Sequence, residues 1–161
     1  MLEEMEVAME IRNTGILVTG ASRGLGLELS RLLAREGGRV VMIARNARDL
    51  DDAVRVVEDD AATAGLGGEA HGLAFDVGSK EAVHRIAGAA GALVGNVDLV
   101  VHAASTLGPL PMPLLLDTDC EDLERVLAVN SSVPFASPRR WLGRWCSASE
   151  ASSCSSARMP L

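Results

Sequence analysis

The residues of this chain with the clearest chemical potential are three glycines in residues 16–26, whose sequence is ILVTGASRGLG. Gly20 would permit a tight turn after an apolar strand, Gly24 would let backbone approach a pyrophosphate, and Gly26 would let a helix pack closely on the strand. The free N–H groups at the start of such a helix attract an anion. Because any tight strand-to-helix turn can use glycine, this pattern alone is weak evidence for a nucleotide site.

Two arginines near this turn indicate which nucleotide it would hold. Arg45 follows the second predicted strand, where dinucleotide sites often carry a carboxylate for the ribose hydroxyls. Arg23 lies inside the turn, and both guanidinium groups could donate to a 2′-phosphate. The sequence therefore predicts NADP(H) in preference to NAD(H), although both arginines could instead be solvated surface residues, and Arg48 is a weaker third cation. The predicted cofactor residues of this region are Gly20, Ser22, Arg23, Gly24, Leu25, Gly26 and Arg45.

Further candidates follow the third and fourth predicted strands. The Asp76 carboxylate could accept a hydrogen bond from an adenine amino group beside the Val77 backbone, or Asp76 could simply be a turn residue. His102 ends the fourth strand, where a lone histidine is more often structural than catalytic. The histidines and the three cysteines lack metal-ligand spacing, so we predict no metal site.

Hydrophobic patterning supplies the elements that would position these residues. Strands are predicted at 16–19, 39–44, 70–75 and 98–102, alternating with helices at about 24–37, 46–64 and 80–94. Leucines 25, 29, 32 and 33 predict the apolar face of the first helix. Ser79 is expected to cap the third helix, and Thr118 with Glu121 to form a capping box for a fourth. This alternation predicts an α/β fold with a doubly wound parallel sheet in the order 3-2-1-4.

Composition narrows the classes of partner. The 161 residues carry a net charge of −7, which argues against nucleic acid as a partner. No apolar run is long enough to span a membrane, and the acidic start does not resemble a signal peptide. The three cysteines, which lack a disulfide-like pattern, suggest a reducing compartment. Together, these features predict a cytoplasmic protein.

Together, these motifs resemble the classical short-chain dehydrogenase/reductase family over residues 14–136. The matching segments are the glycine turn, Arg45, Asp76-Val77, DLVVHAAS at 98–105 and ERVLAVN at 124–130. The resemblance implies a Rossmann-type fold with NADP(H) lying across the strand ends. It also implies that Ala103, Ala104 and Ser105 lie beside the cofactor, in place of the last three residues of the family's N-N-A-G segment. Asn130 matches the family's helix asparagine, which supports a proton path to the active-site lysine.

The family's remaining chemistry has no counterpart in this sequence. In the family, a Tyr-x-x-x-Lys pair supplies the general acid or base, but this chain has no tyrosine and a single lysine, Lys80. We therefore expect an incomplete Rossmann sheet that lacks its C-terminal half, an incomplete dimer interface, and no hydride transfer by this chain alone.

The predicted domain organisation has three parts. Residues 1–14 are a leader, 15–136 are the NAD(P)-binding domain, and 137–161 are a Ser/Arg-rich tail without homology or order. The tail could be a regulatory extension, or it could result from a shifted reading frame or aberrant splicing, which we favour because the pattern breaks inside a helix.

The first functional hypothesis is the cofactor-binding part of an NADP(H)-dependent oxidoreductase acting on a small carbonyl or alcohol. The alternative is a non-catalytic NADP(H)-binding module, or a partner of a full-length paralogue. A weaker hypothesis is binding of another adenine nucleotide, although no G-K-[ST] sequence follows the glycines as in a P-loop.

Overall fold

The computed structural model describes residues 10–132 of the chain. Most of the predicted leader and the whole of the predicted tail at 137–161 therefore lie outside the described residues. Ile11 packs against the buried core, and the Asn13 N–H donates to the Gly37 carbonyl oxygen at 2.8 Å. The described end of the leader is thus tied to the domain that follows it.

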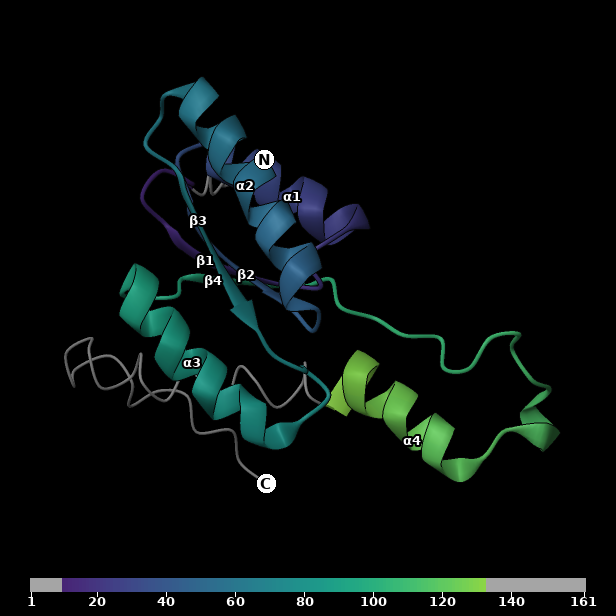
Figure 1. The fold of residues 1–161 in the computed structure, drawn as a ribbon. Coiled ribbons are helices and arrows are strands. Elements are labelled where there is room, and N and C mark those ends of the chain that lie inside the picture. Colours follow the sequence, from purple (N-terminus) through teal and green to yellow (C-terminus); the bar gives the residue numbers. More distant parts are fainter. Residues whose placement is uncertain (1–9, 133–161) are drawn as a thin grey trace, which may run out of the picture. The chain divides into compact units, whose positions relative to one another are not determined.

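Four parallel strands form a single sheet in the order β3-β2-β1-β4 (Figure 1). They are β1 (Gly15–Thr19), β2 (Arg39–Ala44), β3 (Glu69–Ala74) and β4 (Leu99–His102). All five residues of β1 are buried, and so are five of the six in β2. These strands are therefore apolar along their length instead of alternating, as is typical of a sheet covered on both faces. The predicted Rossmann-type topology is confirmed.

Helix α2 (Ala47–Ala64) begins and ends at clear local signals. The Asn46 side chain accepts hydrogen bonds from the N–H groups of Arg48 and Asp49, which caps the first turn. The helix ends at Gly65, which adopts a left-handed conformation with φ of 69°. Its buried face consists of Leu50, Ala53, Val57 and Ala61, spaced as expected for one side of a helix.

Helix α1 (Gly24–Arg35) buries a different face from the one predicted. Its buried residues are Gly26, Ser30 and Ala34, whereas Leu25 and Leu32 are 72% and 55% exposed. The prediction was therefore wrong for Leu25 and Leu32, whereas Leu33 is partly buried and packs against the core. Small residues spaced four apart let the helix approach its neighbours closely, and the Ser30 hydroxyl returns a hydrogen bond of 2.8 Å to the Gly26 carbonyl oxygen.

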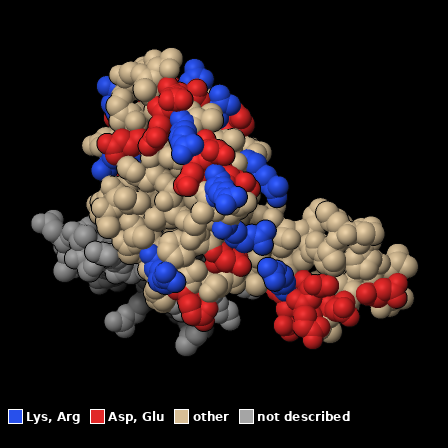
Figure 2. Space-filling model, viewed as in Figure 1, with Lys and Arg blue, Asp and Glu red and all other residues tan. Residues whose placement is uncertain are grey.

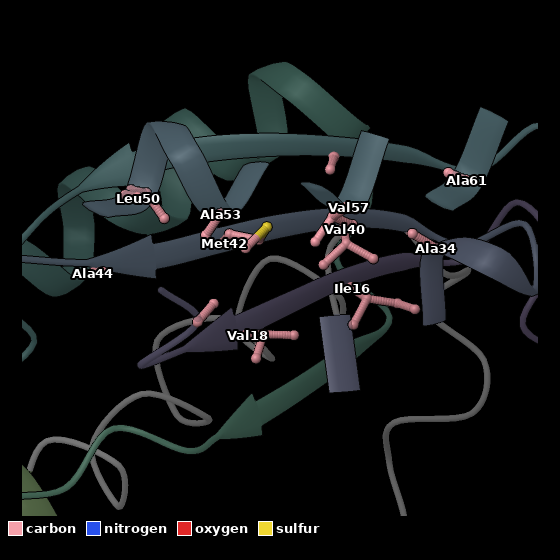
Figure 3. Close-up of a cluster of buried hydrophobic side chains, with 12 residues drawn as sticks. Ile16, Val18, Ala34, Val40, Met42, Ala44, Leu50, Ala53, Val57 and Ala61 are labelled. Carbon is pink, nitrogen blue, oxygen red and sulfur yellow. The ribbon is translucent and has the colours of Figure 1, made fainter. Parts of the chain in front are cut away.

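The main core lies between one face of the sheet and the two helices α1 and α2. Figure 3 shows Ile16 and Val18 of β1 and Met42 of β2 directed toward the same cluster as Leu50 and Val57 of α2. Alternate residues of the same strands, including Leu17 and Ile43, are fully buried on the opposite face. Burial of each such large side chain contributes about 1.5–3 kcal/mol to folding.

The chain divides into two compact units, which we describe separately. The first unit contains the sheet, α1, α2 and the end of α3 (Lys80–Val94), where Ala90 and Val94 are fully buried. The second contains the start of α3, a 3-10 turn η1 (Leu115–Asp117), α4 (Cys120–Leu127) and a π-helical turn η2 (Ala128–Ser132).

The two predicted caps in the second unit had different outcomes. The Ser79 hydroxyl accepts a hydrogen bond from the Ala82 N–H at 3.4 Å, so the predicted cap of α3 is confirmed. The capping box of α4 is wrong, since α4 begins after Asp119. Thr118 instead donates its hydroxyl to the Leu114 carbonyl oxygen at 3.0 Å and closes the preceding turn.

Candidate functional site

The carboxyl ends of the strands meet at one edge of the sheet. Thr19 of β1 is in register with Ile43 of β2 on one side and with His102 of β4 on the other. Ala44 of β2 is in register with Ala74 of β3. The glycine turn, Arg45, Asp76 and Ala103 each follow one of these ends, so the parallel sheet brings segments far apart in the sequence to the same edge.

Two glycines of the turn are required by the packing of the protein itself. Gly20 has a positive φ of 69°, and a side-chain Cβ there would lie 2.7 Å from the Cα and the N of Ala104. A Cβ on Gly26 would lie 2.3 Å from the Gly20 carbonyl oxygen. Gly24 differs, because its φ of 58° also favours glycine but no atom lies within 4 Å of its Cβ position. The helix therefore begins beside open space.

A threonine fastens this turn to β4. Thr19 is 3% exposed, and its hydroxyl accepts a hydrogen bond from the Ala104 N–H at 3.3 Å. Its carbonyl oxygen accepts a second from the Ala103 N–H at 3.2 Å. The Ala21 N–H donates to the Ile43 carbonyl oxygen at 3.1 Å, which ties the turn to β2 as well. The turn is thus held from both neighbouring strands.

The start of α1 is suited to an anion. The residue before the helix, Arg23, has extended backbone and its side chain makes no capping hydrogen bond. The first turn contains no acidic residue. The first N–H groups of a helix lack partners within it, and together they carry a partial positive charge. An anion placed here would meet these groups without competition from a capping side chain.

Two exposed arginines stand at the same edge of the sheet. Among the described residues, neither Arg23 nor Arg45 forms an ion pair. Asn46 follows Arg45 and uses its side-chain oxygen to cap α2, and Arg48 is exposed in the first turn of that helix. Both guanidinium groups are thus exposed and outside the ion pairs of residues 10–132.

Asn130 uses both polar atoms of its side chain within the second unit. Its Oδ1 accepts from the Thr106 N–H at 2.9 Å, and its Nδ2 donates to the Thr106 carbonyl oxygen at 2.8 Å. This pairing joins the π-helical turn to the segment that follows Ser105. Asn130 is therefore a positioning residue in this structure, because its amide accepts one hydrogen bond from the Thr106 backbone and donates one to it.

His102 is a titratable group at this edge of the sheet. Desolvation of the ring lowers the pKa of His102 below its ordinary value of 6.5. The imidazole is therefore neutral at pH 7.

Comparison with known proteins gives the family. A family model described as short chain dehydrogenase matches residues 14–150. The chain belongs to the short-chain dehydrogenase family. The matched range extends beyond residue 136, the end of the range over which the sequence motifs resemble the family.

Two curated proteins are similar to this chain over about two thirds or more of its length. "Probable oxidoreductase EphD" of Mycobacterium tuberculosis is 40% identical over 119 residues, which are 73% of this chain and 18% of that protein. Gluconate 5-dehydrogenase of Gluconobacter oxydans is 36% identical over 107 residues, 66% of this chain and 40% of that enzyme. The chain spans less than two thirds of the length of either relative.

A solved structure shows the same fold. The crystal structure of a metagenomic short-chain oxidoreductase in complex with NADP matches with a TM-score of 0.72 and 31% sequence identity. The match covers 87% of this chain and 60% of the other.

The short-chain dehydrogenase family binds a nicotinamide dinucleotide, and the residues present fit such a group. The open space beside Gly24 and the uncapped start of α1 suit a pyrophosphate. No carboxylate occurs in the four residues after β2. Among the described residues, no group of three histidine, cysteine or acidic side chains could hold a metal ion. None of the helices described is long and apolar enough to cross a bilayer.

The two units divide the predicted cofactor residues of this short-chain dehydrogenase. The first unit holds the glycine turn, Arg45, Asp76, Ala103 and Ala104, whereas Val77, Ser105 and Asn130 belong to the second. Sequence reasoning missed Thr19 as a site residue, although its place directly before the first glycine was a visible signal. The partner of Asn130 could not be found in this way, because Thr106 lies 24 residues away.

Proposed function

We propose that this chain forms the NADP(H)-binding part of an oxidoreductase that moves a hydride between nicotinamide and a small carbonyl or alcohol. The observation that carries the proposal is the pair of exposed arginines, Arg23 and Arg45, beside an uncapped helix start at the carboxyl edge of a parallel sheet. A 2′-phosphate is the group that distinguishes NADP(H) from NAD(H), and guanidinium groups bind phosphate strongly.

Each part of the site has a proposed role in binding. The N–H groups around Ser22, Gly24, Leu25 and Gly26 hold the pyrophosphate, and the two arginines hold the 2′-phosphate. Asp76 and the Val77 backbone contact the adenine, and the backbone of residues 103–105 lies along the cofactor. When bound, the nicotinamide ring accepts or donates the hydride.

We further propose that these 161 residues by themselves bind the cofactor without turning it over. The sequence contains no tyrosine, and its single lysine, Lys80, begins α3. Asn130 holds the segment at Thr106, and its amide is not a titratable group that could replace the missing general acid. Purified chain mixed with NADPH and simple ketones or aldehydes should show no oxidation of NADPH, and sustained turnover would contradict this proposal.

The cofactor proposal is tested by titrating the purified chain with NADPH and NADH and following nicotinamide fluorescence. Arg45→Ala should weaken NADPH binding about 10- to 100-fold, since hydrogen bonds to charged groups contribute about 1.5–3 kcal/mol each. Its NADH affinity should change by less than about twofold. Arg55→Ala is the matched control, because Arg55 is an exposed arginine on α2 that pairs only with Asp52 among the described residues.

The ratio of the NADPH affinity to the NADH affinity decides whether the proposed preference holds. A wild-type chain that binds NADH as tightly as NADPH would refute the proposed preference. An Arg45→Ala variant that loses both cofactors equally would place the arginine in the fold and not at the 2′-phosphate.

A further inference from the structure

The segment of the second unit between β4 and α4 exposes a concentrated group of large apolar side chains. Residues 105–116 contain no acidic or basic residue. Six large side chains of this segment are between 64% and 96% exposed. They are Leu107, Leu110, Met112, Leu114, Leu115 and Leu116. We call these six side chains the loop patch.

The second unit itself holds both ends of this segment. At one end, the Asn130 side chain pairs with the N–H and the carbonyl oxygen of Thr106, at 2.9 and 2.8 Å. At the other end, the Thr118 hydroxyl donates to the Leu114 carbonyl oxygen at 3.0 Å. Three prolines restrict the backbone between these two points. The loop patch is therefore presented on a segment that loses little conformational freedom when it binds a partner.

The area of the loop patch is sufficient for a small specific interface. Burial of one leucine or methionine side chain removes about 60–120 Å² of apolar surface from water. Six such side chains at this exposure, with the prolines between them, offer on the order of 500 Å². Two such patches in contact would bury on the order of 1,000 Å², which is the lower limit for a specific interface between proteins. A second copy of the chain thus brings enough apolar surface to cover the patch.

The charge beside the loop patch limits its possible partners. Residues 117–124, which follow it directly, contain five carboxylates and no lysine or arginine. Figure 2 shows acidic side chains gathered over α4. These carboxylates would be repelled by an anionic lipid surface or by a nucleic acid. When two copies meet through their uncharged patches, the carboxylates can stay at a solvated rim.

We propose that the loop patch is the contact surface of a two-fold homodimer of this chain. Each patch covers its counterpart, so the leucines exposed in one copy pack against the same leucines of the other. Because the area is small, the dimer forms reversibly, with a Kd of about 1–100 μM. The contact is independent of cofactor binding.

Sedimentation equilibrium of the full chain from about 1 to 200 μM tests the proposal. The average mass should rise with concentration and level off at twice the mass of one chain. Raising the NaCl concentration should strengthen the dimer, because salt screens the repulsion between the carboxylates of the two copies. A dimer that weakens as salt is added would depend on opposite charges and would contradict a contact between uncharged patches.

Paired leucine variants locate the contact. Leu110→Ala/Leu116→Ala should weaken dimerisation about 10- to 100-fold, because it removes apolar surface from the loop patch. Both side chains are at least 75% exposed, so the single chain should remain folded, which circular dichroism verifies. Leu32→Ala/Leu93→Ala is the matched control, since it removes exposed leucines from α1 and α3, and it should leave the Kd unchanged.

Several results would overturn the proposal. A wild-type chain that stays monomeric up to about 200 μM would leave the loop patch to a different protein with a basic rim. A loop variant that associates as strongly as the wild type would place the contact elsewhere in the chain. An equal loss in the control variant would show a general effect of removing leucines. Growth beyond the dimer without a plateau would exclude a closed two-fold contact.

Discussion

Gly26→Ala tests the close packing that forms the glycine turn. A Cβ at this position would lie 2.3 Å from the Gly20 carbonyl oxygen, 2.8 Å from its carbon and 3.2 Å from the Ala21 Cα. Ordinary nonbonded contacts need about 3.5 Å, so the start of α1 and the turn must separate by about 1 Å. All three obstructing atoms are backbone, which cannot rotate away as a side chain would.

The expected loss of stability is the balance of two opposing effects. Alanine is the better helix former by about 1 kcal/mol, which favours the substitution. Forcing an extra carbon into a packed region costs about 1–3 kcal/mol, and the upper half of that range applies when only backbone can move. The variant should therefore be about 1–2 kcal/mol less stable, and its Tm should fall by about 2–8 °C.

Thermal unfolding followed by circular dichroism measures this change, with Gly88→Ala as the matched control. Gly88 lies in α3, and no atom lies within 4 Å of its Cβ position. The control should gain up to about 1 kcal/mol from helix propensity alone. If Gly26→Ala raised the Tm as much as Gly88→Ala, the close contact with Gly20 would be absent from the molecule. Gly26→Ala should also weaken NADPH binding, because it displaces the N–H groups at the start of α1.

Three further predictions concern the packing and ionisation of the first unit. Leu50→Ala should lower the free energy of unfolding by about 2–5 kcal/mol in a urea titration, since Leu50 is 1% exposed, and a loss below about 1 kcal/mol would contradict its place in the core. The hydrogen bond from Arg31 at 2.6 Å lowers the pKa of the Asp60 carboxyl below 3.8, so its stabilisation is present above that value and is lost as the pH falls through the lowered pKa. Asp60→Asn should therefore lower the Tm at pH 7 but not at the acid end of a pH series, whereas the more exposed Asp52→Asn should have little effect at either pH. The His102 ring should titrate below pH 6.5 by NMR, and because its pKa falls on folding, its protonation should reduce stability as the pH drops; a midpoint at or above 6.5 would refute the desolvation.

The regular elements could be predicted from local patterns because their signals are local. The second strand was predicted at its observed bounds, since the apolar run VVMIA lies between a double glycine with Arg39 on one side and Arg45 with the capping Asn46 on the other. The inner face of α1 could not be predicted from leucine spacing. Close approach of the helix selected Gly26, Ser30 and Ala34, and the space available beside a helix is a property of its neighbours.

The same distinction applies to the candidate site. Arg23 and Arg45 could be assigned to one edge of the sheet from the sequence, because the carboxyl ends of parallel strands must lie together. The positions of Asn130 and Thr19 in hydrogen-bonding networks could not, since their partners lie 24 and 85 residues away. The spacing of residue types along a sequence does not reveal which distant backbone group a polar side chain will contact.

The sequence by itself therefore determined the family, the strand order, the glycine turn and the cations beside it, because each depends on residue types at short, fixed spacings. Only the tertiary structure decided why Gly20 must be glycine, since the obstructing atoms belong to Ala103 and Ala104, which follow β4. It also decided that the Asn130 amide is engaged with backbone and that Leu123 and Leu127 remain uncovered by the described residues. These properties depend on contacts between distant segments, which exist only once the chain has folded.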